Sequence, residues 1–212
     1  MSAITHHIRP ELILAWVSGN LPPAFSAVVA SHVALCPECR AEAGAAQSLG
    51  GALLEEVGEV ALSSDALARA LAALDDPSLR PPPAPIAAGI FPAPVMQVLG
   101  GRPPKWSQLG GGIRQQILIS DRSGSLRLLY IPPGRKVPEH GHRGLELTLV
   151  LQGSFSDSEG SFGVGDVEDA DDAVNHQPIA GPGEPCICLA ATDAPLHFNA
   201  FLPRLLQPLF RI

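Results

Sequence analysis

The chain has 212 residues, 46% of them hydrophobic, which is enough for one large domain or two small ones with a true core. This composition excludes wholesale disorder. The formal net charge of -7 is uneven: residues 1–76 hold three basic and nine acidic groups, a net of -6, and the remainder holds 11 and 12, a net of -1. The acidic first third argues against direct nucleic-acid binding, which needs Lys and Arg at the phosphates, and suits a basic protein partner.

The first residues lack the basic and apolar segments of a signal peptide, and no apolar run approaches the roughly 20 residues that a membrane helix needs. We therefore expect a cytoplasmic protein with no membrane contact. In that reducing compartment, the spacings Cys36-x-x-Cys39 and Cys186-x-Cys188 indicate metal binding or redox work and not structural disulfides.

Residues 1–76 predict a small helical domain. Proline is favoured in the first turn of a helix, so one helix is expected from Pro10 through Trp16 and another from Pro22-Pro23. Pro37 ends the second helix and can begin a third, and apolar spacing predicts a fourth over residues 65–74. A helical domain this short has a marginal core.

The pattern His32-x-x-x-Cys36-x-x-Cys39 falls where the second helix meets the third. His32 and Cys36 are four residues apart and share a helix face, and a helix N-terminus favours the thiolate form of Cys39. These three side chains supply three ligands of a tetrahedral zinc site, and bound zinc would stabilise the small domain. The fourth ligand must come from elsewhere, with His6 and His7 as the nearby candidates; buried cysteines without a metal are the alternative.

Residues 77–104 are rich in proline and predict a semi-rigid linker, part of which could dock through Phe91 and Val95. From residue 105 to residue 212, short strands between Gly, Pro and Asp-rich turns replace the helices and predict an antiparallel β-barrel. The clearest predicted strands cover residues 113–119, 125–131, 145–151 and 186–190, with a further one possible over 196–201.

A second group of candidate metal-binding residues lies in the β-rich part. His140 and His142 are two apart on a segment with strand character, so both side chains point to one side, and Glu146 begins a buried strand after a turn. Imidazoles and a carboxylate on adjacent strands make a divalent-metal site. His176, which follows another turn, is the candidate for the fourth ligand.

This arrangement resembles the cupin family. Gly134, His140, His142, Glu146 and Gly153 fill that family's first motif without a gap. The second motif fits less well, because Asp171-Asp172-Ala173 stands where a Pro-x-Gly turn is usual. Arg143, Glu139 and Asp166 are expected to be solvated charges at the rim.

Cys186 and Cys188 are two apart in a predicted strand, so their sulfurs share a face. If that face is the barrel interior, the two thiols lie near the metal and could respond to oxidants. A direct bond between them would be strained, and two small core residues are the alternative interpretation.

A second resemblance covers the chain from end to end. The early His-His pair, the run Cys-Pro-Glu-Cys-Arg and the following cupin-like part are similar to the ChrR type of zinc-binding anti-sigma factors of bacteria. The resemblance implies that His7 is the fourth ligand of the first site. It also implies a helical domain that wraps an extracytoplasmic-function sigma factor and blocks its access to RNA polymerase, with release by singlet oxygen or organic peroxides.

We therefore expect an α + β protein of two domains: a zinc-binding helical domain over residues 1–76, the linker over 77–104, and a cupin-type β-barrel over 105–212. The expected function is regulation and not catalysis, with zinc in the first site and zinc, iron, manganese or nickel in the second. The alternative is a cupin dioxygenase or isomerase that acts on a small molecule, since open positions on an octahedral metal could take oxygen or substrate. A binding module with two structural zinc ions is the third interpretation.

Overall fold

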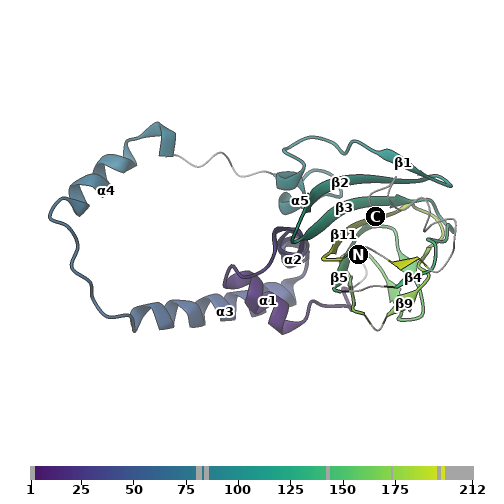
Figure 1. Ribbon diagram of the computed structural model, residues 1–212, viewed down its shortest axis with the longest axis horizontal. Helices are drawn as coiled ribbons and strands as arrows, with labels where there is room; N and C mark the ends of the chain where they lie inside the picture. The colour runs from purple at the N-terminus through teal and green to yellow at the C-terminus, as the bar shows by residue number, and fades with distance from the viewer. Residues whose placement is uncertain are drawn as a thin grey trace.

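The computed structural model describes residues 3–79, 83, 86–141, 144–172 and 174–194, together with the backbone of residues 197 and 198. The helices come first in the chain and the strands follow (Figure 1). The helical elements are α1 (Pro10–Val17), α2 (Pro23–Leu35), α3 (Pro37–Glu55), α4 (Ala66–Leu74), the 3-10 turn η1 (Pro77–Leu79) and α5 (Ala93–Val98). The four predicted helices are confirmed, and proline stands at the start of the first three because it lacks the N–H that a helix start cannot pair.

Six antiparallel strands form the main sheet, in the order β1-β2-β3-β11-β5-β8. Their bounds are β1 (Ser107–Gly110), β2 (Ile113–Asp121), β3 (Gly124–Ile131), β11 (Cys186–Thr192), β5 (Glu146–Gln152) and β8 (Val167–Ala170). The short strands β10 (Ile179–Ala180), β6 (Phe155–Ser156) and β7 (Ser161–Phe162) make a second sheet, and β12 (His197–Phe198), β4 (His140–Gly141) and β9 (Asn175–His176) make a third. The expected helical part and β-domain are thus confirmed, but the described strands form a sandwich of three sheets and not one closed barrel.

Alternation along the strands gives the main sheet two apolar faces. One face carries Leu147 and Leu149 of β5 and packs against Phe25 and Val28 of α2 in one continuous core. The other face carries Val150 of β5 and, from β11, both sulfur atoms of the Cys186-x-Cys188 pair, and it packs against the short strands. The β-domain therefore has an inner core of its own and shares its outer core with the helices.

The boundary between the two parts is not visible as a break in packing. The expected linker contains α5, whose Val95 is buried in the same core as α2. The division into residues 1–76, 77–104 and 105–212 remains a prediction. In the part of the chain that the structure describes, no helix combines the length and the hydrophobicity needed to cross a membrane.

The edge strand β8 is covered by the N-terminal segment. The backbone N–H of Val167 in β8 donates to the carbonyl of His6 at 3.1 Å, and the Arg9 guanidinium contacts the carboxylate of Asp169. An uncovered edge would expose unpaired backbone groups, so this contact protects the sheet. It also brings the start of the chain next to the end of α2.

Candidate metal centres

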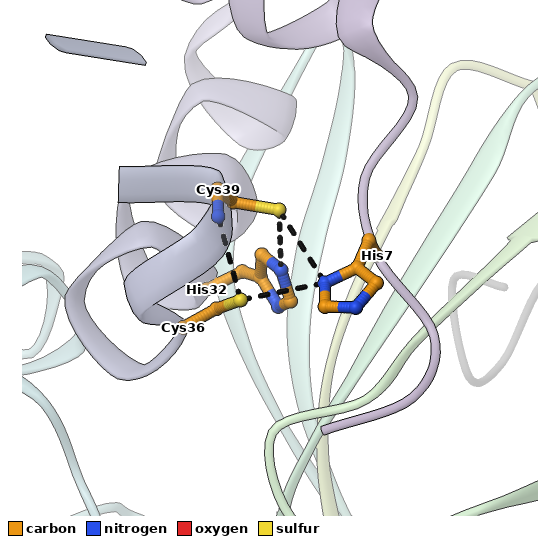
Figure 2. Close-up of side chains that lie close together, drawn as sticks. All are labelled: His7, His32, Cys36 and Cys39. Atoms are coloured by element: carbon orange, nitrogen blue, oxygen red, sulfur yellow. Dashed lines mark hydrogen bonds between the residues drawn. The ribbon is translucent and has the colours of Figure 1, made fainter. Parts of the chain in front are cut away.

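His7, His32, Cys36 and Cys39 converge on one point between the N-terminal segment and the α2–α3 junction (Figure 2). The Nε2 atom of His32 lies 3.2 Å from the sulfur of Cys39. The Nδ1 atom of His7 lies 3.4 Å from the sulfur of Cys36 and 3.7 Å from that of Cys39. All four donor atoms lie within 4.8 Å of one another. We call these four residues the helical cluster.

Local structure places three of the four donors. His32 is in the last turn of α2, and Cys36 is both the C-cap of α2 and the N-cap of α3. The backbone N–H of Cys39 points at the sulfur of Cys36, at 3.5 Å. Helical spacing and a shared cap therefore bring these three side chains together, as the sequence predicted.

The helical cluster has the donors and the spacing of a tetrahedral metal site. Zinc bonds of about 2.3 Å to sulfur and about 2.0 Å to nitrogen would separate nitrogen and sulfur donors by roughly 3.5 Å, close to the separations present. Without a cation, burial raises the pKa of the Cys39 thiol to about 11, and burial lowers the pKa of His32. A bound cation would reverse the effect on the thiol and stabilise its thiolate. The cluster can therefore hold a metal ion.

The second ring nitrogen of each histidine in the helical cluster also has a partner. The Nδ1–H group of His32 donates to the carbonyl of Gly165 at 2.8 Å, which leaves the lone pair of Nε2 facing the sulfurs. The Nε2 atom of His7 lies 3.3 Å from the carboxylate of Glu38. Such contacts fix the orientation of metal-binding imidazoles.

The structure separates the two candidates for the fourth donor. His7 joins the cluster, whereas the ring of His6 packs on Phe162 of the β-domain with centroids 4.5 Å apart. Adjacent residues of an extended segment point to opposite sides, so only one of the two can face the sulfurs. Sequence reasoning without the family resemblance could not choose between them.

A second cluster lies inside the β-sandwich. It contains His140 from β4, Glu146 from β5 and His176 from β9, with their donor atoms within 4.8 Å and all three residues buried. The Nε2 atoms of the two histidines are 3.2 Å apart. We call these three residues the cupin cluster. His142, the remaining predicted ligand, lies outside the described residues.

The histidines of the cupin cluster are oriented by further contacts. The Nδ1–H group of His140 donates to the carbonyl of Pro138 at 2.8 Å. The Nδ1 atom of His176 lies 2.6 Å from the carboxylate of Asp157 and 3.0 Å from that of Glu168. In both rings the Nε2 atom is left to face the centre of the cluster.

Burial and these contacts change the protonation of the cluster. Burial raises the pKa of Glu168 to about 8. Burial lowers the pKa of His176, but the hydrogen bond and charge of Glu168 outweigh it and raise that pKa to about 9. Without a metal, Glu168 and His176 therefore hold more protons than the same side chains in water, and metal binding to the cluster would release them.

Sequence reasoning missed three carboxylates around these clusters. Asp157 and Glu168 were not predicted to contact a histidine, and Asp166 was expected at the solvated rim. That expectation was wrong, because Asp166 is buried and accepts hydrogen bonds from the backbone N–H groups of Thr5 and His6. No local pattern could reveal a contact with residues 160 positions earlier in the chain.

The cysteine pair of β11 faces the inner core beside the cupin cluster. The sulfurs of Cys186 and Cys188 are 3.3 Å apart and both thiols are free. The hydrogen bond to Cys186 and burial raise the pKa of Cys188 well above its usual value, and the carboxylates of Glu168 and Glu146 add to the effect. The structure thus places both thiols on the inner face of the sheet, in a setting that disfavours the thiolate.

Comparisons with known proteins agree with this architecture. Residues 102–195 match the family described as the ChrR cupin-like domain. The chain is 54% identical over 211 residues to the anti-sigma-E factor ChrR of Cereibacter sphaeroides, covering 99% of both chains. It is also similar to the crystal structure of Rhodobacter sphaeroides SigE in complex with the anti-sigma factor ChrR, with a TM-score of 0.80, 50% identity, and coverage of 90% of this chain and 100% of that one. The chain therefore belongs to the ChrR family of anti-sigma factors.

Proposed function

We propose that this protein is a zinc-dependent anti-sigma factor that works in the cytoplasm. It binds an extracytoplasmic-function sigma factor, keeps it from RNA polymerase, and releases it when the cupin part meets singlet oxygen or an organic peroxide. The observation that carries this proposal is the end-to-end similarity to the anti-sigma-E factor ChrR and to the structure of a SigE–ChrR complex. The relatives bearing these names are regulators, so we favour regulation over dioxygenase or isomerase activity.

Zinc is the metal that we assign to the helical cluster. Two thiols and two imidazoles at tetrahedral spacing form the donor set of structural zinc sites, and thiolates disfavour Mg²⁺ and Ca²⁺. The ion would tie the N-terminal segment to the start of α3 through His7 and Cys39. It would thereby fix the direction of α3 relative to α1 and α2.

The sigma factor would dock on apolar side chains that the fold leaves in water. Figure 1 shows α4 standing away from the rest of the molecule, joined to the end of the long α3 by an extended segment. We call the exposed apolar side chains of this region the leucine arm: Leu49, Leu53, Leu54, Val57, Val60, Leu62, Leu67, Leu71 and Leu74. Leu67 and Leu71 are four residues apart on one face of α4 and are 72% and 55% exposed. Exposed apolar surface of this extent marks a protein-binding site, and a helix can lay such a face into a groove of its partner.

The cupin cluster would hold the second ion. We assign His140, His142, Glu146 and His176 as the ligands of this ion. Zinc is the preferred metal, and iron, manganese and nickel are the alternatives. The neighbouring Cys186 and Cys188 would serve as redox sensors. An organic hydroperoxide would transfer one oxygen atom to one of these thiols, which becomes a sulfenic acid while the hydroperoxide is reduced to its alcohol.

The helical cluster is tested by co-purification with a sigma factor of this class and by zinc analysis. We expect His32→Ala and Cys36→Ala to lose zinc from this cluster and to abolish sigma binding. His7→Ala should behave in the same way, whereas His6→Ala should retain both. Full inhibition of transcription by the His32 and Cys36 variants would contradict the proposal.

The cupin cluster is tested by a separate measurement. Glu146→Ala should still bind and inhibit the sigma factor but should respond less to singlet oxygen or an organic hydroperoxide in a transcription assay. His142→Ala should do the same. A variant of the cupin cluster that no longer binds the sigma factor would show that the roles are not divided in this way.

The leucine arm is tested by charged substitutions. Leu67→Asp and Leu71→Asp should leave the free protein as stable as before, because these side chains are already in water, while sigma affinity falls at least tenfold. Leu14→Asp is the matched control, since Leu14 is 54% exposed on α1 and lies outside the arm. Unchanged affinity in both arm variants would place the interface elsewhere.

A further inference from the structure

One short segment lies between the two metal clusters and contacts both. It comprises Gly165 and Asp166 of the turn before β8 and residues Val167, Glu168 and Asp169 of β8 itself. We call it the β8 segment. Along a strand, side chains alternate between the two faces of the sheet. Glu168 accordingly points into the sandwich toward His176, whereas Asp169 points outward and binds Arg9.

The first residue of the segment orients a ligand of the helical cluster. The carbonyl of Gly165 accepts the Nδ1–H of His32, so the β-domain fixes which nitrogen of His32 faces the sulfurs. Glycine is required here for two reasons. Its φ of +95° disfavours other residues, and a Cβ would lie 2.6 Å from the side chain of Ile4.

The second and third residues of the segment hold the backbone next to His7. The Oδ1 atom of Asp166 accepts the backbone N–H groups of Thr5 at 2.7 Å and His6 at 2.9 Å, and its other oxygen accepts that of Gly163 at 2.8 Å. The N–H of Val167 donates to the carbonyl of His6, the peptide group that leads into His7. Residues 3–9, the described part of the N-terminal segment before α1, form no helix or strand, so these bonds set the position of the His7 ring.

The opposite face of the same segment supports the cupin cluster. Glu168 is 4% exposed, and its Oε1 atom lies 3.0 Å from the Nδ1 atom of His176. A change in the position of His176 would therefore shift Glu168. The two neighbours of Glu168 in sequence bind the N-terminal segment on both sides of His7: Val167 donates to the His6 carbonyl, and Asp169 binds the Arg9 guanidinium. Strand β8 therefore connects the two clusters. Glu168 on its inner face contacts the cupin cluster, and Val167 and Asp169 on its outer side hold the segment that carries His7.

We propose that the β8 segment positions ligands of both clusters, so that a change in the cupin cluster alters how tightly the helical cluster holds its metal. This inference rests on the proposed function in one respect, namely that both clusters hold metal in the active protein. The acceptor groups of the cupin part, chiefly the Asp166 carboxylate and the Gly165 carbonyl, are then positioning groups for a metal site of the helical part.

The test uses the full chain loaded with zinc. Alkylation of Cys36 and Cys39 by iodoacetamide at a fixed chelator concentration is followed by mass spectrometry of the peptide ending at Arg40, since a thiolate bound to zinc is protected. Asp166→Ala should speed this alkylation about tenfold or more, in the range found for lost contacts behind metal ligands. Asp166→Asn, which keeps the shape and one acceptor oxygen, should give an intermediate rate.

Two controls separate positioning from general stability. Asp121→Ala removes a carboxylate that likewise accepts a backbone N–H, from Ser123 at 2.7 Å, but in the β2–β3 turn. Ile131→Ala weakens the inner core at β3, which β11 and β5 separate from β8. The urea concentration is adjusted so that all variants have the same free energy of unfolding. Under that condition, both controls should leave the alkylation rate unchanged, whereas Asp166→Ala should raise it.

The coupling between the clusters is tested by Glu168→Gln, which changes only the inner face. We expect it to raise the alkylation rate of Cys36 and Cys39 several-fold. If zinc gives no protection even to the unmodified chain, the proposed function fails. If protection is present but Asp166→Ala matches its two controls, the positioning role is overturned. A Glu168→Gln rate equal to that of the unmodified chain would overturn the coupling alone.

Discussion

Phe25 lies at the centre of the core that the helices share with the main sheet. It is 2% exposed and belongs to the same cluster of buried residues as Leu147 and Leu149 of β5. Replacing a buried phenylalanine by alanine costs about 3–5 kcal/mol of stability through lost transfer energy and the cavity left behind. Because this core is continuous, Phe25→Ala should destabilise the helices α1–α3 and the sheet together.

The two tryptophans of the chain allow each part to be followed separately. Trp16 lies in α1 and Trp106 just before β1, so single-tryptophan variants with phenylalanine at the other position report on the two parts. With a urea slope of about 3 kcal/mol/M, Phe25→Ala should lower both unfolding midpoints by about 1–1.7 M. Leu54→Ala is the control: because Leu54 is 72% exposed, this substitution should change neither unfolding midpoint. A shift confined to the Trp16 signal would show that the two parts unfold independently and would refute the reasoning.

Three further predictions concern the clusters. Because the pKa of Glu168 is raised to about 8 and that of His176 to about 9, these two groups bind more protons in the metal-free folded chain than in the unfolded chain, whereas the lowered pKa of His32 opposes them below pH 6.5. The stability of the metal-free chain should therefore fall as the pH rises from about 6.5 to 9, measured by urea midpoints at stepped pH, with a smaller fall in Glu168→Gln. Cys188→Ser should retain sigma binding but weaken the response to an organic hydroperoxide in a transcription assay; an unchanged response would remove Cys188 from the sensor. Gly165→Ala should lower the melting temperature more than Gly183→Ala, because both glycines have similar positive φ values but only Gly165 has a close neighbour; equal losses would show that the close approach is unimportant.

The parts of the fold that the sequence predicts well are those set by local rules. Proline places the start of α1, α2 and α3 almost to the residue, and Pro37 also ends α2, whereas no end was predicted for α3, which runs to Glu55. The spacing of His32, Cys36 and Cys39 identifies three donors because helix geometry and the shared cap decide their positions. The four clearest strands were also recognised, since each is a short segment rich in apolar residues between turn residues.

The parts that the sequence does not predict depend on contacts between distant segments. The helix α5 is short and lies in a proline-rich stretch, so only its burial against α2 distinguishes it from linker. The strand β8 contains Glu168 and Asp169, which lower its β-propensity, and it is stable because β5 pairs with it on one side and the N-terminal segment covers the other. Asp166 looked like a solvated charge because its partners are the backbone groups of residues 5 and 6.

The origin of the four donors in the helical cluster explains why the β-domain can influence it. Three donors come from the α2–α3 junction and are brought together by local structure, but His7 comes from an extended segment that must be ordered for the ring to bind. Ordering a backbone costs about 1–2 kcal/mol for each residue, and hydrogen bonds to a charged group return about 1.5–3 kcal/mol each. The two bonds that Asp166 accepts contribute about 3–6 kcal/mol together, which is comparable with the cost of ordering the three residues Thr5, His6 and His7. Contacts from the β-domain thus determine whether His7 is positioned to complete the helical cluster. The same cluster fixes the start of α3, the helix that leads into the leucine arm.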